Sequence, residues 1–308
     1  MTRRFNDQQV LGFLVSQRSY IETEVNRTVY PEIQYPSLVP IDTSAPDWIS
    51  TVTYYSQDMY GKAEWINPNA DDVPKAGTNR AKYETAVHTA GIGYGYGVGE
   101  LETAMLMGVN LANEDAMAAR RAYEEMVDRV VVFGDVAKGF YGLINAPGVT
   151  AGSAVNGNWL TTATPLQMIA DVNTALTGQY SGTLFTSVAD TLLLPYAHWL
   201  KLATTPMSAE NSQSVLDYIT TKNVFTAATG RPLTVRAVRG LETAGAGGTA
   251  RMVSYRYDRN VLKLHIPMPH KFLETWRAGP LRWEVPGIFR LGGLDVRRPK
   301  EMAYTDGI

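Results

Sequence analysis

Residues 111–145 decide the fold, and they read LANEDAMAARRAYEEMVDRVVVFGDVAKGFYGLIN. Through the first part of this stretch, charged and apolar side chains recur with the period of an amphipathic helix. The apolar side chains that share one face are Met117, Ala119, Ala122, Tyr123, Met126, Val127, Val130 and Val131. Gly134 and Asp135 follow these positions and predict the end of the helix. Such a helix has about 20 residues and is roughly 30 Å long, which suits a strut across a whole subunit.

Local signals support this helix. Asn113, followed by two acidic residues, suits an N-terminal cap or first turn. Glu125 and Arg129 are spaced for an ion pair across one helical turn. We expect Met126 and Val130 to face a β-sheet formed by later strands. An amphipathic helix on the surface of an unrelated globular protein would show the same periodicity.

The sequence around this helix resembles the major capsid proteins of tailed phages, which share the Hong Kong 97 type fold with encapsulins. The helix ends in FGD and is followed by a short polar turn and GLIN at 142–145. The segments YPEIQYPSLVPIDTSAPDWISTVTYYSQDMYGKAEW at 30–65 and NADDVP at 69–74 also resemble one branch of that family. The resemblance runs from about Tyr30 to the C-terminal strands and is weakest over 152–248.

The resemblance implies an α+β capsid fold with an N-terminal arm, an extended hairpin loop, a peripheral domain that holds the spine helix and a β-sheet, and an inserted axial α/β domain. The implied ranges are 1–47 for the arm, 48–90 for the hairpin loop, 91–145 with 249–308 for the peripheral domain, and 146–248 for the axial domain. The implied function is a major capsid protein that self-assembles into an icosahedral head shell enclosing the phage genome.

The implied partners are copies of the chain itself in hexamers and pentamers, together with scaffolding and portal proteins. The shell would enclose double-stranded DNA without sequence-specific contact. An encapsulin-like compartment around cargo protein is the first alternative, and a soluble hydrolase or binding protein is the second. Relatives with a cleaved scaffolding segment have a longer N-terminus, so we expect a separate scaffolding protein and no large cleaved prodomain.

Composition limits the classes of function. The 308 residues carry a formal net charge of -2 with both signs interspersed, so tight direct binding of nucleic acid phosphates is not indicated. The chain has no cysteine, which excludes disulfides, thiolate chemistry and cysteine-based zinc sites and fits assembly in a reducing host cytoplasm. No segment approaches the roughly 18 apolar residues of a membrane span, so we expect no membrane association. The location that the resemblance implies is the virion.

Motifs for catalysis are missing from the sequence. His88, His198, His265 and His270 do not have the H-E-x-x-H spacing, and no G-x-S-x-G elbow occurs. A metal site at His265 and His270 and a triad dispersed along the chain stay open as alternatives. The run GIGYGYGVGE at 91–100 lacks the spacing of a nucleotide loop and predicts a strand with one bare face that another backbone approaches. We therefore expect no enzyme and no catalytic, cofactor or metal residue.

The N-terminal part predicts an arm. A short amphipathic helix is expected at 7–17, and four prolines over 30–47 favour a long extended segment. Its apolar side chains, which include Ile33 and Tyr35, need a surface. That surface belongs either to another subunit or to the arm's own domain, and the pattern does not distinguish the two.

Residues 49–92 predict a protruding hairpin. Strand-like runs at 49–65 and 82–92 flank the polar tip NPNADDVPKAGTNR. A two-stranded ribbon is too thin to enclose a hydrophobic core. Its aromatic side chains must therefore pack against a surface outside the ribbon. Asp71 and Asp72 at the tip suit a solvated loop or a contact with arginines of a neighbour. The candidate assembly interface comprises Ile33, Tyr35, Tyr54, Tyr55, Trp65, Asp71, Asp72 and Lys75.

The remaining chain predicts an α/β insertion followed by β structure. After a short helix at 100–107 and the long helix, the predicted elements are helices at 165–178, 191–202 and from 208 or 212 to 222, strands at 182–188 and 233–238, and a glycine-rich loop at 242–250. A hairpin with its turn at 258–260 and a final strand pair over 283–294 are expected to pack on the long helix. The peripheral domain would then be interrupted in sequence by the insertion.

Overall fold

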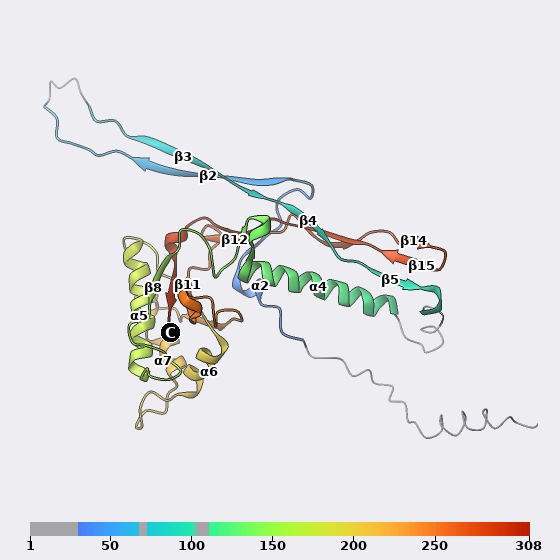
Figure 1. Ribbon diagram of the computed structural model, residues 1–308. Helices are drawn as coiled ribbons and strands as arrows, with labels where there is room; N and C mark the ends of the chain where they lie inside the picture. The colour runs from blue at the N-terminus through green and yellow to red at the C-terminus, as the bar shows by residue number, and fades with distance from the viewer. Residues whose placement is uncertain (1–29, 68–72, 101, 103–110) are drawn as a thin grey trace, which may run out of the picture. The chain divides into compact units, whose positions relative to one another are not determined.

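A computed structural model describes residues 30–67, 73–100, 102 and 111–308 (Figure 1). The helix predicted at 7–17, most of the helix predicted at 100–107, and Asp71 and Asp72 lie outside the described residues. Residues 33–308 form one compact unit.

The long helix is present as α4, Leu111–Phe133. It buries Tyr123, Val127, Val130 and Val131 in a core with residues of later strands, and Met126 is half-buried against the same core. This confirms the predicted packing of Met126 and Val130. The helix ends as predicted at Gly134, where the backbone has a left-handed φ of 76° that glycine adopts without strain.

Two details of the helix prediction were wrong. Met117 is 45% exposed, because the core that α4 contacts begins nearer to Tyr123. Glu125 forms its ion pair with Arg121, at 2.9 Å, instead of with Arg129. Both residues in this pair lie on the solvent side of α4, where such a pair contributes only a few tenths of a kcal/mol.

A five-stranded sheet in the order β10-β9-β11-β18-β8 separates two hydrophobic cores. Side chains alternate across it because successive residues of a strand point to opposite faces. Leu193, Val253 and Tyr255 enter the core of α4, whereas Leu192 and Met252 enter the second core. The strands are β8 Thr150–Ser153, β9 Thr191–Leu194, β10 Thr234–Ala237, β11 Arg251–Tyr255 and β18 Met302–Asp306.

The second core is covered by four helices and contains the fully buried Trp159. The helices are α5 Pro165–Gly182, α6 Tyr196–Thr204, α7 Val215–Thr221 and α8 Val224–Thr229. The helix predicted at 165–178 is therefore confirmed but continues four residues beyond Gly178. Helix α7 begins later than predicted, because the Ser214 hydroxyl accepts a hydrogen bond from the Asp217 backbone nitrogen (3.1 Å) and caps the helix there.

Two predictions for the insertion were wrong. Residues 182–188 form the end of α5 and a turn instead of a strand. Residues 191–194 form strand β9, and only the residues after Pro195 are helical. The sequence Thr-Leu-Leu-Leu is buried on both faces of the sheet, so it lacks the alternation that marks a half-buried strand. The strand predicted at 233–238 is confirmed as β10.

Three smaller three-stranded sheets complete the part of the fold around α4. Their orders are β1-β12-β17, β13-β16-β4 and β14-β15-β5. The strands are β1 Ile41–Asp42, β4 His88–Gly91, β5 Tyr94–Gly97, β12 Leu262–His265, β13 Met268–Phe272, β14 Trp276–Gly279, β15 Arg282–Val285, β16 Gly287–Leu291 and β17 Gly293–Val296. The remaining short elements are β6 Gly134–Asp135, β7 Phe140–Tyr141, η1 Val136–Lys138, η2 Ala246–Gly248 and η3 Pro299–Glu301.

The predicted strand pairs near the C-terminus were wrong. Strands β11 and β12 on either side of residues 258–260 belong to different sheets, so no hairpin forms there. Residues 283–294 are divided by Pro286 and Gly292 among three strands in three sheets. Proline cannot donate to a ladder. Strand β15 pairs with the adjacent β14 and with β5, β16 pairs with β13 and β4, and β17 pairs with β12.

The strand with one bare face predicted at 91–100 is present only in part, because Gly91 ends β4, residues 94–97 form β5 and residues 98–100 are helical. Gly91, Gly93 and Gly95 lie close to the backbone of residues 283–287, whereas Gly97 and Gly99 have no such close contact. A Cβ atom at Gly93 would collide with the Val285 carbonyl oxygen, and one at Gly95 would lie 2.9 Å from the Trp283 carbonyl oxygen. Side chains larger than hydrogen would therefore force these strands apart.

The arm at 33–42 wraps around its own subunit. The backbone nitrogens of Gln34 and Tyr35 donate to Asp128 Oδ1 of α4 at 3.0 and 2.7 Å. The Tyr255 hydroxyl donates to the Leu38 carbonyl oxygen at 2.6 Å, and Leu38 is buried. A helical turn, α2 Tyr35–Leu38, interrupts the segment. The prediction of an extended arm was wrong over this turn, and of the two possible surfaces the arm's own domain is the one used.

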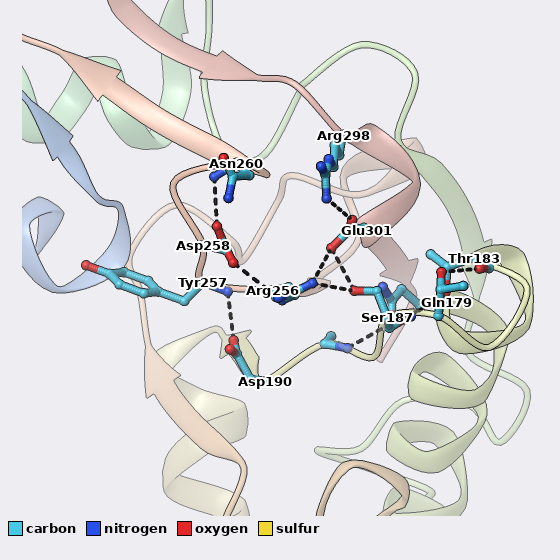
Figure 2. Close-up of polar contacts among 12 residues, drawn as sticks. Gln179, Thr183, Ser187, Asp190, Arg256, Tyr257, Asp258, Asn260, Arg298 and Glu301 are labelled. Atoms are coloured by element: carbon cyan, nitrogen blue, oxygen red, sulfur yellow. Dashed lines mark hydrogen bonds and ion pairs between the residues drawn. The ribbon is translucent and has the colours of Figure 1, made fainter. Parts of the chain in front are cut away.

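A cluster of polar side chains joins three distant segments, as Figure 2 shows. Glu301 accepts hydrogen bonds from Ser187 Oγ at 2.7 Å and from Arg256 at 3.3 Å. Arg298 donates to the other carboxylate oxygen of Glu301 at 3.2 Å. Ser187 and Glu301 are buried, so their contacts fix the turn after α5 against η3.

We predict that Tyr255→Phe loosens the arm. The substitution keeps the ring and leaves the buried Leu38 carbonyl without its donor, which costs about 1–3 kcal/mol. A lower Tm and faster limited proteolysis within residues 33–42 are expected. Tyr257→Phe is the matched control, because that side chain is 41% exposed. Equal Tm values and cleavage rates for the two variants would show that this hydrogen bond does not hold the arm.

Candidate assembly surfaces

The predicted hairpin is present as β2 Thr51–Tyr60 and β3 Gly77–Ala86. The two strands pair in register from Thr51 opposite Ala86 to Tyr60 opposite Gly77. They form a two-stranded sheet that no third described strand joins (Figure 1). The strands were predicted at 49–65 and 82–92. The first therefore ends earlier than predicted, at Tyr60, and the second begins earlier than predicted, at Gly77. Such a ribbon has little stability of its own in water.

The two faces of the hairpin differ in character. Residues that are opposite each other in an antiparallel pair lie on the same face. One face therefore carries Val52, Tyr54, Tyr60 and Tyr83. The other face carries Tyr55 and Met59 among Arg80, Lys82 and Glu84. The exposed fractions are 68% for Tyr55, 78% for Met59 and 63% for Tyr60, so the ribbon presents large apolar side chains to solvent.

The base of the hairpin is tied to its own subunit. The rings of Tyr54 and Tyr83 stack across the two strands with centroids 5.1 Å apart. The Arg297 guanidinium lies 4.4 Å from the centroid of Tyr54, a distance typical of a cation–π contact. Burial, together with nearby Asp295, raises the pKa of Tyr54. The hairpin is therefore fixed at its base and exposed beyond it.

Charged side chains link the arm to this base. Asp42 of the arm pairs with Lys263 at 2.9 Å, and Arg297 pairs with Asp295 at 2.9 Å. The buried His265 lies between the two carboxylates, with ring nitrogens 3.7 Å from Asp42 Oδ2 and 3.5 Å from Asp295 Oδ2. The arm, strands β12 and β17, and the hairpin base thus share one electrostatic cluster.

The pKa values of the two carboxyl groups reflect their partners. Burial alone would raise the pKa of Asp42, but hydrogen bonds from Ser44 and Lys263 outweigh burial and lower it. Burial likewise opposes ionisation of Asp295, while His265 and Arg297 lower its pKa overall. Both groups are therefore ionised at neutral pH and stabilise the folded subunit in that form.

The predicted interface residues occupy different environments. Tyr35 is buried in the subunit's own core, Ile33 packs partly against that core, and Tyr54 is half-buried at the hairpin base. Tyr55 and Lys75 are exposed, and Trp65 has a relative exposure of 105%. Tyr54 and Tyr55 share strand β2 but point to opposite faces. The structure therefore leaves the hairpin residues available to a neighbour and surrounds Tyr35 with its own chain.

Sequence reasoning missed the cluster of Asp42, His265, Asp295 and Arg297. Its members come from three separate segments, and no local spacing brings them together. The parallel pairing of Asp42 opposite His265 creates the cluster. Only knowledge of that pairing would have identified it.

The histidines have local structural contacts. His270 stacks on Tyr123 with ring centroids 5.4 Å apart, and His88 Nε2 hydrogen-bonds the Lys138 carbonyl oxygen at 3.1 Å. Within the described ranges, no group of three or more histidine and acidic side chains has the arrangement of a metal site. Among the described helices, none is both long and apolar enough to cross a bilayer.

Comparison with solved structures identifies the fold class. The capsid of Myoviridae phage XM1 superposes with a TM-score of 0.81 at 17% identity, covering 95% of this chain and 98% of the other. A structure from Mycobacterium phage Bobi has a TM-score of 0.65 at 13% identity and covers 99% of both chains. At these identities the likeness shows the fold, which is the α+β, Hong Kong 97 like fold of phage capsids. No curated protein sequence matches the chain.

The family follows from the sequence comparison. The model of the family described as Major capsid protein matches residues 61–308, which is most of the chain. The chain therefore belongs to the major capsid protein family. It is a structural protein of the capsid shell and a virion component that assembles with copies of itself. The encapsulin-like alternative is not favoured by these matches.

We predict that Asp42→Asn lowers Tm at pH 7. Because the folded pKa of Asp42 is depressed, its stabilisation is fully present above the unfolded value of about 3.9 and is lost as pH falls through the folded value. The Tm values of the original protein and the variant should therefore converge as pH falls from about 5 to 2. Thermal unfolding followed by circular dichroism measures both curves.

The control for this prediction is Asp47→Asn. Asp47 pairs with Lys271 at 3.4 Å, but both side chains are about half exposed, so little stabilisation is expected. A difference between original protein and Asp42→Asn that stays constant down to pH 2 would show that the depressed pKa is not the cause.

Proposed function

We propose that this capsid protein forms hexamers and pentamers of a closed icosahedral head shell and that each hairpin of β2 and β3 lies on a neighbouring subunit. The observation that carries the proposal is the exposure of Tyr55, Met59, Tyr60 and Trp65 on a segment without a core. Aromatic side chains and methionine are typical of the buried centres of protein interfaces.

The attachment of the hairpin base supports an intersubunit role. Tyr54 is held by Arg297 of the same chain and stacks on Tyr83, so the exposed part begins at a defined position. A neighbour that covers the exposed side chains would remove them from water and limit the freedom of the ribbon at the same time. Each such contact is modest, and a closed shell repeats it around every subunit.

The division into functional parts follows the two cores. We assign 1–47 to the arm, 48–90 to the hairpin loop, 91–145 with 249–308 to the peripheral domain, and 146–248 to the axial domain. The insertion supplies most of the second core, which supports treating it as a separate part. It contributes β8, β9 and β10 to the five-stranded sheet, while β11 and β18 come from the peripheral range.

The proposed partners follow from the role in the shell. Scaffolding and portal proteins would assist assembly in the host cytoplasm, and the absence of cysteine fits that compartment. The shell would enclose double-stranded DNA without sequence-specific contact, in keeping with the net charge of -2. The role is structural, and we assign no catalytic residue, cofactor or metal.

The hairpin assignment predicts a separation of folding from assembly. Residues 55–82 are replaced by Asn-Gly, which favours a tight turn directly after the Tyr54–Tyr83 pair. Because none of the described residues among those removed belongs to either core, Tm and far-ultraviolet circular dichroism should change little. Closed particles should be absent in negative-stain electron microscopy.

Point substitutions provide the matched comparison. Trp65→Ser removes a fully exposed hairpin aromatic, and Trp276→Ser removes an aromatic of β14 that is 56% exposed. We expect Trp65→Ser to reduce particle yield more than Trp276→Ser does. Normal shells from the shortened protein would rule out the hairpin as the intersubunit contact, and an unfolded shortened protein would assign it to the subunit's own core.

A further inference from the structure

A buried histidine lies between two carboxylates that come from different segments. His265 of β12 is 2% exposed. Its Nδ1 lies 3.7 Å from Asp42 Oδ2 of the arm, and its Nε2 lies 3.5 Å from Asp295 Oδ2 of β17. Both ring nitrogens are shielded from solvent, and neither has a hydrogen-bond partner in the described part of the chain. Each nitrogen therefore faces an acceptor at a distance slightly beyond a normal hydrogen bond.

The strand pairing fixes this arrangement. Strand β1 of the arm pairs in parallel with β12 and places Asp42 opposite His265. Strand β17 pairs with the other edge of β12 and supplies Asp295. A Cβ atom at Gly292 would lie 2.9 Å from the Cβ atom of His265 and 3.4 Å from Val87 Cγ2, so this side of the histidine is closely packed and apolar. The ring is therefore held where it meets both carboxylates.

The protonation state of the ring decides how many contacts it makes. A neutral imidazole has one N–H donor and one acceptor nitrogen, so it can donate to only one of the two carboxylates. Its other nitrogen then turns a lone pair toward the second carboxylate oxygen, which is unfavourable. A protonated imidazole has two N–H donors and a positive charge, so it can donate to both carboxylates. The surroundings of His265 are therefore matched to the protonated form.

Two cations share these carboxylates with the histidine. Lys263 Nζ lies 2.9 Å from Asp42 Oδ2, and Arg297 Nε lies 2.9 Å from Asp295 Oδ2. Among the described residues, these four side chains are the charged groups within ion-pair distance of the ring or of one another. The titratable phenol of Tyr54 belongs to a ring whose centroid lies 4.4 Å from the Arg297 guanidinium. The network thus runs from the arm through β12 and β17 to the hairpin base.

We propose that His265 is a pH-sensitive latch between the arm and the base of the hairpin. The protonated ring donates to Asp42 and to Asp295, and so ties β1 to β17 across β12. Loss of the proton removes one of these two bonds, and the arm is then held less firmly. The inference concerns the folded subunit and goes beyond the proposed role in the shell.

The direction of the pH effect follows from the charges. Histidine is the side chain that ordinarily changes its charge between about pH 5 and 8. Burial opposes ionisation of Asp42 and Asp295, but hydrogen bonds and neighbouring cations lower both pKa values overall, so the two carboxylates stay charged through this range. The stabilisation from the protonated ring is therefore present on the acidic side of the range and is lost as pH rises. Protonation of Asp42 itself occurs only in more acidic solution.

Hydrogen exchange of the full chain measures the latch. The Leu264 backbone nitrogen donates to the Pro40 carbonyl oxygen at 2.9 Å, and the Ile266 nitrogen donates to the Asp42 carbonyl oxygen at 3.0 Å. These two amides therefore report release of the arm. Exchange is followed by mass spectrometry at about pH 5.5 and 8 and is corrected for the intrinsic pH dependence of each amide. We expect the protection of both amides to be about tenfold lower at the higher pH.

Two variants assign this change to the histidine. His265→Gln keeps polar atoms at the site but cannot gain a proton, so its corrected protection should be the same at both pH values. Asp42→Asn removes the carboxylate of the arm and should reduce the pH effect, and it serves as the test if His265→Gln does not fold. The proposal is overturned by an undiminished pH effect in either folded variant, or by the lack of any pH effect in the original protein.

The matched control is His88→Gln. His88 Nε2 hydrogen-bonds the Lys138 carbonyl oxygen at 3.1 Å, and no carboxylate pairs with its ring among the described residues. This variant should keep the pH effect of the original protein. Loss of the effect in His88→Gln would show that protonation of His265 does not control the arm and would overturn the proposal. All of these measurements use the subunit alone, so their outcome leaves the proposed shell function unaffected.

Discussion

The five-stranded sheet with β9 and β11 at its centre is the constraint on which the rest of the subunit depends. Its central strands are buried on both faces, so each alternate residue belongs to a different hydrophobic core. A shift of register by one residue would exchange the two sets of side chains and disrupt both cores at once. The position of α4 on one side and of α5 on the other therefore follows from one strand register.

Local sequence signals predicted the elements whose periodicity is intact. Helix α4 has an apolar face and a glycine stop, and the hairpin has strand-forming runs around a polar tip. The same reasoning failed for β9, because Leu192 and Leu193 enter different cores and the run shows no alternation. It also paired β11 with β12 through proximity in sequence, whereas β11 joins β9 and β18.

The exposure of the candidate interface residues was predicted only in part. An apolar side chain in an extended segment signals that it needs a surface but does not say whose surface. Tyr35 found that surface in its own subunit, held by Asp128 and the core, while Tyr55 and Trp65 remained exposed. The cluster around His265 could not be predicted, because the arm had to be placed beside β12 before its charges met.

The folded subunit and the proposed assembly contacts depend on different residues of this chain. The two cores, the shared sheet and the buried arm contacts at Leu38 involve groups that are already out of water in a single subunit. The described residues of the hairpin beyond Tyr54 contribute no member to either core. Because the folded state does not require them, such segments can be optimised for neighbours without loss of the subunit.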